Sequence, residues 1–206
     1  MKIKKPVIPL GIKKIEKDFN SEKFEAFIIE DFDFTQYTDG FSLKYSKLIG
    51  ANFSFGRFDD VYFSNSVLEK INFSGSTFTN TFFDRVVIKN SWIQGADFSD
   101  LKFENVVFQS CKIDAVNFTN SVLKNVVFEN STLENANFVA ADLENIFFKN
   151  SNLKNADLSH SKKKNLNLIG SEINGIKIEK DDFDKLTVDT GQALYLASIC
   201  GLKIEK

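Results

Sequence analysis

The chain has 206 residues, of which 43% are hydrophobic, and a formal net charge of −2. This length suits one domain or at most two, and the chain lacks the continuous apolar run of about 18 residues that a membrane-spanning helix needs. The two cysteines match no metal-binding spacing, and the basic N-terminus lacks the apolar core of a secretory signal. We therefore expect a cytoplasmic protein with reduced thiols.

The N-terminal part of the chain differs from the rest. Residues 1–18 contain both prolines, and we predict that they form a tail or a cap. From residue 10 onward the chain has no proline, as expected where nearly every backbone N–H is needed for hydrogen bonds between strands. Over residues 19–42 apolar residues already recur every five positions, from Phe19 to Phe34, but the step from Phe34 to Leu43 is nine. This pattern predicts an irregular first coil with a one-residue slip near the sequence QYTDG.

A strict five-residue period governs residues 43–183. Of the 29 positions taken every fifth residue from Leu43 to Phe183, 28 are Phe, Leu or Ile, and the exception is Lys163. Two residues before most of these centres lies a small or β-branched residue, and two residues after the centre lies most often Asn or Gly. Because Asn and Gly tolerate left-handed backbone conformations, each pentapeptide predicts a short extended side followed by a corner.

A second, longer period indicates the number of sides. The similar segments RVVIKN, NVVFQS, NVVFEN and NIFFKN begin at Arg85, Asn105, Asn125 and Asn145, so they recur after every four pentapeptides. Four pentapeptides per turn place these segments above one another. The fold class predicted for residues 19–183 is therefore an all-β solenoid, a quadrilateral β-helix with the Phe and Leu centres inside. Crossover chirality favours a right-handed coil, and about 4.8 Å per strand gives roughly seven coils and a rod about 35 Å long.

Lys163 occupies a position where a core residue is expected. Two interpretations are open. A local bulge can let the Lys163 side chain escape from the core, or Lys162, Lys163 and Lys164 can form a basic contact site.

After Phe183 the pattern changes to that of a helix. Asp189 and Gln192 have the spacing of a capping box, and Gly201 is a suitable C-terminal cap. The run 193–200 is apolar nearly all round, so one side of the helix can rest on the last coil while the other needs a partner. We predict that residues 184–206 form a short C-terminal α-helix and dimerisation segment. A second copy is expected to contact the following residues: Leu194, Tyr195, Leu196, Ile199 and Leu202.

The repeated unit resembles that of a known family. The units ANFSF, ADFSD, ANFVA, ADLEN and ADLSH follow the pattern small–Asn/Asp–Leu/Phe–polar–x, the signature of pentapeptide repeat proteins. That family implies a right-handed four-sided β-helix. The length, the uninterrupted coils and the hydrophobic C-terminal helix ending in GLKI resemble the Qnr-type quinolone-resistance subgroup, which binds DNA gyrase and topoisomerase IV and protects them from drugs. Many of those proteins also carry loops that break the repeat, and the unbroken register from Leu43 to Lys162 leaves no room for such loops.

The side-chain inventory does not favour an enzyme. The only histidine, His160, is expected at a solvated corner, Cys111 at an inward small-residue position, and Cys200 in helix packing. No phosphate-binding loop, metal cluster or nucleophile–base pair is recognisable, so we predict no catalytic residues, no metal and no cofactor. The lack of a basic stripe with interleaved aromatics argues against direct binding of nucleic acid.

Two surface features are candidates for partner binding. One side of the predicted solenoid carries five outward aspartates, here called the acidic face: Asp59, Asp60, Asp97, Asp100 and Asp157. A rigid strip of carboxylates can imitate the phosphates of a DNA duplex, although a duplex about 35 Å long carries roughly twenty charges. The other feature, here called the Val stripe, is an outward apolar column on the side with the NVVF segments: Val67, Val87, Val107, Val127 and Phe147.

Each feature also has a purely structural interpretation. The acidic face can be a solvated surface with Asp and Asn at turns, and the Val stripe can be a ladder that stabilises its own coils. The leading hypothesis is a non-enzymatic protein that binds DNA gyrase or topoisomerase IV through the acidic face by partial DNA mimicry and protects against quinolones. The alternative is a structural or adaptor scaffold with no topoisomerase contact.

Overall fold

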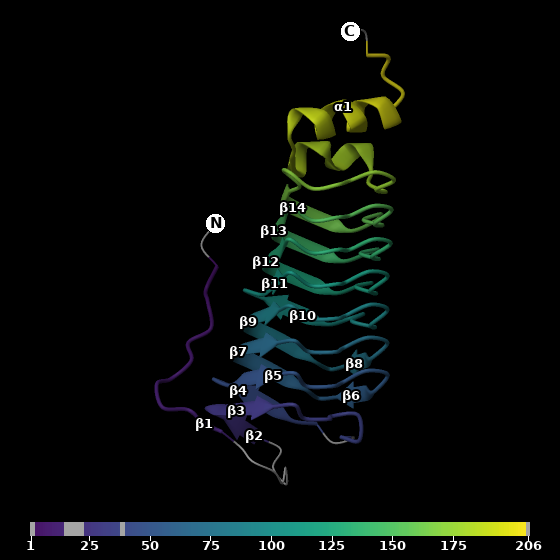
Figure 1. The fold of residues 1–206 in the computed structure, drawn as a ribbon. Coiled ribbons are helices and arrows are strands. Elements are labelled where there is room, and N and C mark those ends of the chain that lie inside the picture. Colours follow the sequence, from purple (N-terminus) through teal and green to yellow (C-terminus); the bar gives the residue numbers. More distant parts are fainter. Residues whose placement is uncertain (1–2, 15–22, 38–39, 205–206) are drawn as a thin grey trace.

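The computed structural model describes residues 3–14, 23–37 and 40–204, which form a parallel β-solenoid with short helices at its C-terminal end (Figure 1). The strands up to residue 89 are β1 (Lys13–Lys14), β2 (Lys23–Glu25), β3 (Phe27–Glu30), β4 (Ser42–Lys44), β5 (Lys47–Ile49), β6 (Arg57–Asp59), β7 (Tyr62–Glu69), β8 (Thr77–Thr79) and β9 (Phe82–Lys89). The later strands are β10 (Lys102–Glu104), β11 (Val107–Gln109), β12 (Val122–Glu129), β13 (Asp142–Lys149), β14 (Lys162–Asn167) and β15 (Leu186–Thr187). The helices are the 3₁₀-helix η1 (Lys180–Lys185) and the α-helix α1 (Thr190–Ile199).

The register of the strands confirms the predicted coil of four pentapeptides. Phe83 of β9 lies between Phe63 of β7 and Phe103 of β10, and all three strands run parallel. Every fifth residue from Tyr45 to Gly175 has a positive φ, whichever residue type stands there. These residues are the corners between the sides, and Asn and Gly predominate among them because both tolerate this backbone conformation. The predicted alternation of short sides and corners is therefore confirmed.

Aromatic rings fill the interior of the solenoid. The rings of Phe63 and Phe83 stack with centroids 4.8 Å apart, and those of Phe83 and Phe103 have the same separation. This separation matches the spacing of about 4.8 Å between neighbouring strands, so the same residue type in successive coils stacks without a shift. All three side chains are fully buried. The strict recurrence of Phe and Leu in the sequence thus produces a continuous apolar core.

The first coil is one residue shorter than the others. Phe24 pairs with Leu43 and Ile29 with Leu48, whereas Leu43 pairs with Phe63 and Leu48 with Leu68 in the next coil. This register confirms the predicted slip, although residues 38–39 of the QYTDG segment lie outside the described residues. Phe41 occupies a position that holds a small or β-branched residue in most later coils, and its ring stacks 5.2 Å from that of Phe34.

Residues 3–12, here called the N-terminal arm, run along the outside of the solenoid (Figure 1). The arm leads into β1, where Lys13 pairs in parallel with Phe27. The prediction of a tail or cap over residues 1–18 is covered by the structure only for residues 3–14. Phe19 lies in the segment 15–22, outside the described residues.

The coil pattern ends before Phe183. Ile173 and Ile176 are still buried, but residues 180–185 form η1, and Phe183 is only partly buried within it. The five-residue register had predicted a further coil side there. Five of the six residues of η1 are charged, and burying unpaired charges in a closed apolar core is strongly unfavourable. The chain therefore leaves the solenoid and covers its end with helices.

The helix α1 forms as predicted. The N–H of Gln192 donates to Oδ1 of Asp189 and the N–H of Asp189 donates to Oε1 of Gln192, both at 3.0 Å, which completes the capping box. Gly201 has a φ of 84° just after the helix and is its C-terminal cap. The Gln192 side chain also donates to the carbonyls of Leu168 and Ser171, so the start of the helix is tied to the last coil.

Candidate functional site

The acidic face is divided over several columns of the solenoid. Asp97 and Asp157 stand in the same column, but Asn117 and Asn137 lie between them in the parallel register. Three coil steps of about 4.8 Å separate the two carboxylates by about 14 Å. The structure therefore does not bring Asp157 together with Asp97.

The other carboxylates of the acidic face lie at a neighbouring corner. Asp60 and Asp100 are both exposed corner residues with positive φ, and the corner residue of the coil between them is Asn80. Asp59 is exposed on β6 beside Asp60. Four of the five aspartates thus gather within two coil steps, about 10 Å along the rod. They are here called the acidic edge: Asp59, Asp60, Asp97 and Asp100.

Hydrogen bonds to the next coil or turn hold two of these carboxylates in place. Asp59 accepts from Oγ1 of Thr79 at 2.5 Å and from Nδ2 of Asn80 at 3.0 Å. Asp97 accepts from the N–H of Ser99 at 3.1 Å and from Nδ2 of Asn117 at 2.9 Å. The donors belong to the coil itself, so these side chains have a fixed orientation relative to the rod.

Asp157 is the exception in this set because a cation neutralises it. Its Oδ2 lies 2.9 Å from Nζ of Lys177, which occupies the same column one coil later. Burial raises the pKa of Asp157, but the hydrogen bonds with Ser159 and Lys177 outweigh it, and the pKa is lowered overall. Asp157 is ionised but offers little free negative charge to a partner.

Sequence reasoning missed a hollow beside the acidic corner. Asp60 and Asp100 line it, together with Tyr62, Phe82 and Lys102 among others. Tyr62 and Phe82 face each other in the register of β7 and β9, and Phe82 faces Lys102. The period of four pentapeptides places these outward residues in one column, so the sequence did contain the signal. The acidic edge therefore adjoins a surface with exposed aromatic groups.

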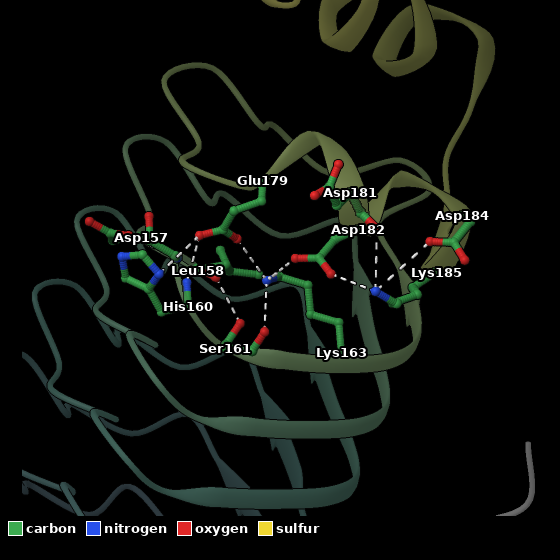
Figure 2. A network of polar contacts seen from close by, with 11 residues as sticks. Asp157, Leu158, His160, Ser161, Lys163, Glu179, Asp181, Asp182, Asp184 and Lys185 are labelled. Atoms are coloured by element: carbon green, nitrogen blue, oxygen red, sulfur yellow. Dashed lines mark hydrogen bonds and ion pairs between the residues drawn. The ribbon is translucent and has the colours of Figure 1, made fainter.

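Lys163 lies inside the last coil, contrary to both interpretations of the sequence. Its backbone stays in register opposite Leu143, and its side chain has no solvent exposure. Figure 2 shows the ammonium group between the carboxylates of Glu179 and Asp182, at 3.2 and 2.7 Å from their oxygens. The group also donates to the carbonyl of Ser161 at 3.0 Å. The chain thus neither bulges nor presents Lys163 to a partner.

The surroundings of Lys163 form one connected polar group, here called the Lys163 cluster: Ser161, Lys163, Glu179, Asp182 and Lys185 (Figure 2). Burial raises the pKa of Asp182, but the hydrogen bonds from Lys163 and Lys185 outweigh it and lower the pKa. Glu179 and Asp182 lie in or beside η1, whereas Lys163 belongs to β14. The cluster therefore joins the last coil to the C-terminal helices.

The two other lysines of the suggested contact site remain on the surface. Lys162 is exposed, and Lys164 forms an ion pair with Glu144 at 2.7 Å while its side chain stays 75% exposed. Only these two could contribute to a basic contact.

Cys111 and His160 occupy the positions expected of them, and Cys200 is the half-buried residue that ends α1. Cys111 is buried, as predicted, and burial raises the pKa of its thiol to about 11. His160 is an exposed corner residue with a φ of 59°. Within the described ranges no cluster of three or more His, Cys, Asp or Glu side chains is arranged to hold a metal ion. The described helices include none with the length and apolar character needed to cross a membrane.

The residues predicted to contact a second copy divide into two groups. Leu196 is only 4% exposed because it packs on the last coil, and the Tyr195 hydroxyl accepts a hydrogen bond of 2.7 Å from the N–H of Gly175. Both side chains are therefore used within the chain, and the expectation that they face a partner is corrected. Leu194, Ile199 and Leu202 remain 48%, 47% and 64% exposed.

Comparisons with known proteins identify the repeat. Residues 89–158 match the family model described as "Pentapeptide repeat region", and residues 57–91 match that described as "Pentapeptide repeats (8 copies)". No curated protein sequence matches the chain.

Several solved structures are similar in shape at low sequence identity. The full-length structure of QnrB1, titled a plasmid-mediated fluoroquinolone resistance protein, is 15% identical, with 87% of this chain and 100% of that chain covered and a TM-score of 0.45. HetL from the cyanobacterium Nostoc sp. strain PCC 7120, titled as involved in heterocyst differentiation regulation, is 14% identical, with 76% and 85% covered and a TM-score of 0.44.

Proposed function

Because this chain is a pentapeptide repeat protein, we propose that it is a non-enzymatic protein that binds DNA gyrase or topoisomerase IV and protects them against quinolones. The observation that supports this proposal is the gathering of Asp59, Asp60, Asp97 and Asp100 within about 10 Å on a rigid rod. Arg57 is the one outward base among them on that side. Asp157 is left out of the proposed contact because Lys177 neutralises it.

Charge density decides whether this edge can replace DNA. A duplex carries one negative charge per about 1.7 Å, so a length of about 10 Å holds roughly six. The edge offers four carboxylates, which Arg57 reduces to a net of three. The whole protein has a net charge of only −2, but the edge alone has about half the local charge density of the duplex. The proposed mimicry is thus confined to one part of the rod.

A gyrase supercoiling assay tests the proposal. We expect the purified protein to restore supercoiling in the presence of ciprofloxacin, and the Asp97→Asn, Asp100→Asn double variant to restore it at least about tenfold less efficiently. Asparagine occurs naturally at both positions in other coils, as Asn117 in the Asp97 column and Asn80 at the Asp100 corner, so the coil geometry is kept.

The matched control carries two changes on the other sides of the rod, Glu129→Gln and Glu134→Gln. It has the same net charge as the double variant and should behave like the parent. If parent and double variant act alike on gyrase, the acidic edge is not the contact. If the parent changes neither the drug curve nor the drug-free curve, the adaptor scaffold without topoisomerase contact is the better interpretation.

We also propose that two copies join through their C-terminal ends. An apolar groove there is lined by Phe183 of η1 and Leu186 of β15, by residues of α1, and by Val188 and Leu202 on either side of α1. Leu194 and Ile199 project from the same helix into solvent. A helix that is apolar on all sides needs to be covered on its outer side as well as on the side that faces the coils. The last coil covers only the side of α1 that carries Leu196.

Light scattering tests this contact. The parent should have about twice the chain mass of 23.4 kDa, and the Leu194→Asp, Ile199→Asp variant should have the mass of one chain. Leu196→Asp is unsuitable as a probe because Leu196 is part of the core. A parent that already has the mass of a single chain at high concentration would exclude this dimer.

A further inference from the structure

The Val stripe is a straight apolar column with polar ends. The register places Val67, Val87, Val107, Val127 and Phe147 directly above one another. Lys47 precedes the column and Asn167 follows it. Four coil steps give the stripe a length of about 19 Å, which five or six residues of extended chain can span.

The N-terminal arm lies over this stripe. Ile3 and Lys5 of the arm line one hollow together with Val87, Val107, Val127 and Phe147. Figure 1 shows the arm beside the stacked strands, running from β1 toward the later coils. Within the arm, these residues are partly buried: Ile3, Pro6, Ile8 and Ile12.

The arm is only loosely seated. Within the described ranges, no backbone hydrogen bond joins residues 3–12 to the coils. A hollow of about 560 Å³ remains where the arm passes the stripe. Two apolar residues of the arm point away from the coils, Val7 with 66% exposure and Leu10 with full exposure. Such a contact contributes little to the stability of the fold and can be exchanged for another segment.

Charged side chains of both signs lie beside the stripe. Lys5 of the arm shares its hollow with Glu129 and also with Lys149 of the coils. The arm itself carries Lys4 and Lys5 next to Ile3, so the surface accommodates an extended apolar segment with lysines beside its apolar residues.

We propose that the Val stripe is a docking surface for an extended, apolar, lysine-bearing segment of a partner protein, and that the N-terminal arm is its displaceable internal occupant. The arm is the segment that lies on the stripe in this structure, so its apolar and lysine side chains indicate the chemistry of a segment that the stripe can bind. A β-branched ladder serving only its own coils would not require Phe147 in the column, nor the partly buried arm residue Ile3 beside it. This proposal is independent of any topoisomerase contact.

The internal arm weakens every competing partner. A tethered segment has an effective concentration in the millimolar range, so a partner must displace it before binding. Releasing the arm should therefore raise the apparent affinity for an external segment of the same chemistry, without any change in the stripe itself.

Fluorescence anisotropy with a labelled peptide IKKPVIPLGIKK, the sequence of residues 3–14, tests the proposal on the full-length chain. The arm is released by Ile3→Asp with Ile8→Asp, and we expect the peptide to bind this variant at least tenfold more tightly than the parent. Adding Val107→Lys to the released variant should weaken binding at least tenfold. Lysine is tolerated at this outward position, since Lys47 occupies the same column.

Val122→Lys is the matched control. Val122 is also an outward valine and lies on β12 with Val127, but it pairs with Lys102 in a different column from the Val stripe. It should leave peptide binding to the released variant unchanged. A peptide with both isoleucines at its first and sixth positions changed to aspartate should compete at least tenfold less well, whatever the stability of the protein variants.

Three outcomes would overturn the proposal. Equal peptide binding by the parent and the released variant would show that the arm does not occupy the surface. Equal weakening by Val122→Lys and Val107→Lys would place the peptide elsewhere. A parent whose mass rises with concentration, and falls again on Val107→Lys, would show that the stripe pairs two copies of this chain and not a different partner.

Discussion

The middle coils and the last coil of this solenoid solve the same packing problem in different ways. In the middle coils aromatic rings stack on one another, as Phe83 does on Phe63 and Phe103, each at 4.8 Å. In the last coil the equivalent interior position holds Lys163, whose ammonium group is bound by Glu179 and Asp182. The middle is held by apolar stacking, whereas the end is held by a buried ion pair.

The difference shows how a repeat protein ends. An apolar centre in the last coil would present its upper side to solvent or to another rod, because no further coil covers it. Lys163 instead requires carboxylates, and only the segment that follows the repeat supplies them. The ion pair is therefore specific for one covering segment, the C-terminal helices. Ring stacking in the middle is not specific in this way, because any coil with the same interior residues can stack there. Buried polar groups that specify one arrangement at some expense of stability are known in other folds.

Removing a ring from the middle coils should have the largest effect. Phe83→Ala leaves a cavity between two fully buried rings, and we expect the free energy of unfolding to fall by about 3–5 kcal/mol. Phe183→Ala, in partly buried η1, should lower it by about 1–2 kcal/mol, since less apolar surface is lost. Urea unfolding followed by circular dichroism measures both. Equal losses would contradict the view that stacking stabilises the middle more than the end.

Removing the charge from the last coil should have an intermediate effect that is local. In Lys163→Met the side chain volume is kept, but the carboxylates of Glu179 and Asp182 lose their buried cation. Loss of one partner of a buried pair costs about 3–5 kcal/mol, and we expect about 2 kcal/mol because Lys185 still pairs with Asp182 and Glu179 is partly exposed. Hydrogen exchange should quicken in residues 180–199 while the strands β7 to β12 keep their protection.

The control for this change is one residue away. Lys164→Met removes an ion pair with Glu144 that lies in solvent, and ion pairs of this kind contribute little to stability because water and salt screen them. It should alter neither the unfolding curve nor the exchange of residues 180–199. If Lys163→Met proved as harmless as Lys164→Met, the ion pair would not hold the C-terminal helices to the rod.

The periodic part of the fold could be predicted because its cause is local and repeated. Each corner depends on the residue at that corner, so the corners follow the five-residue period. Each stacked ring depends on the residue four pentapeptides away, so the stacking follows the 20-residue period. The helix α1 was predictable for a similar reason, since Asp189 and Gln192 of its capping box are three residues apart.

The features that escaped prediction depend on contacts outside the period. Lys163 is bound by Glu179 and Asp182, which lie in a segment that no longer follows the repeat. The N-terminal arm lies on the Val stripe although it has no periodic pattern of its own. The division of the acidic face was predictable in principle, because Asp97 and Asp157 are separated in the sequence by three whole coils. The period assigns both residues to one side of the solenoid, and the number of coils between them sets their separation along it.

The smallest expected effect concerns the pH dependence of the last coil. Burial raises the pKa values of Glu179 and Asp182, but hydrogen bonds outweigh it, so both are lowered in the folded protein. A carboxyl group with a lowered folded pKa contributes stability that is present above its unfolded pKa, near pH 4, and is lost as the pH falls through its folded pKa. The difference in unfolding free energy between the parent and Lys163→Met should therefore shrink from about 2 kcal/mol at pH 7 to below about 1 kcal/mol at pH 3, a change kept small by solvent screening at the partly exposed Glu179. The pKa values of carboxylates elsewhere in the solenoid, such as Glu69 and Asp157, are also lowered. Their contribution to the pH dependence of stability is the same in both proteins, so it cancels when the two are compared at each pH. A difference that stays constant with pH would mean that Lys163 stabilises the end by packing and not by its charge.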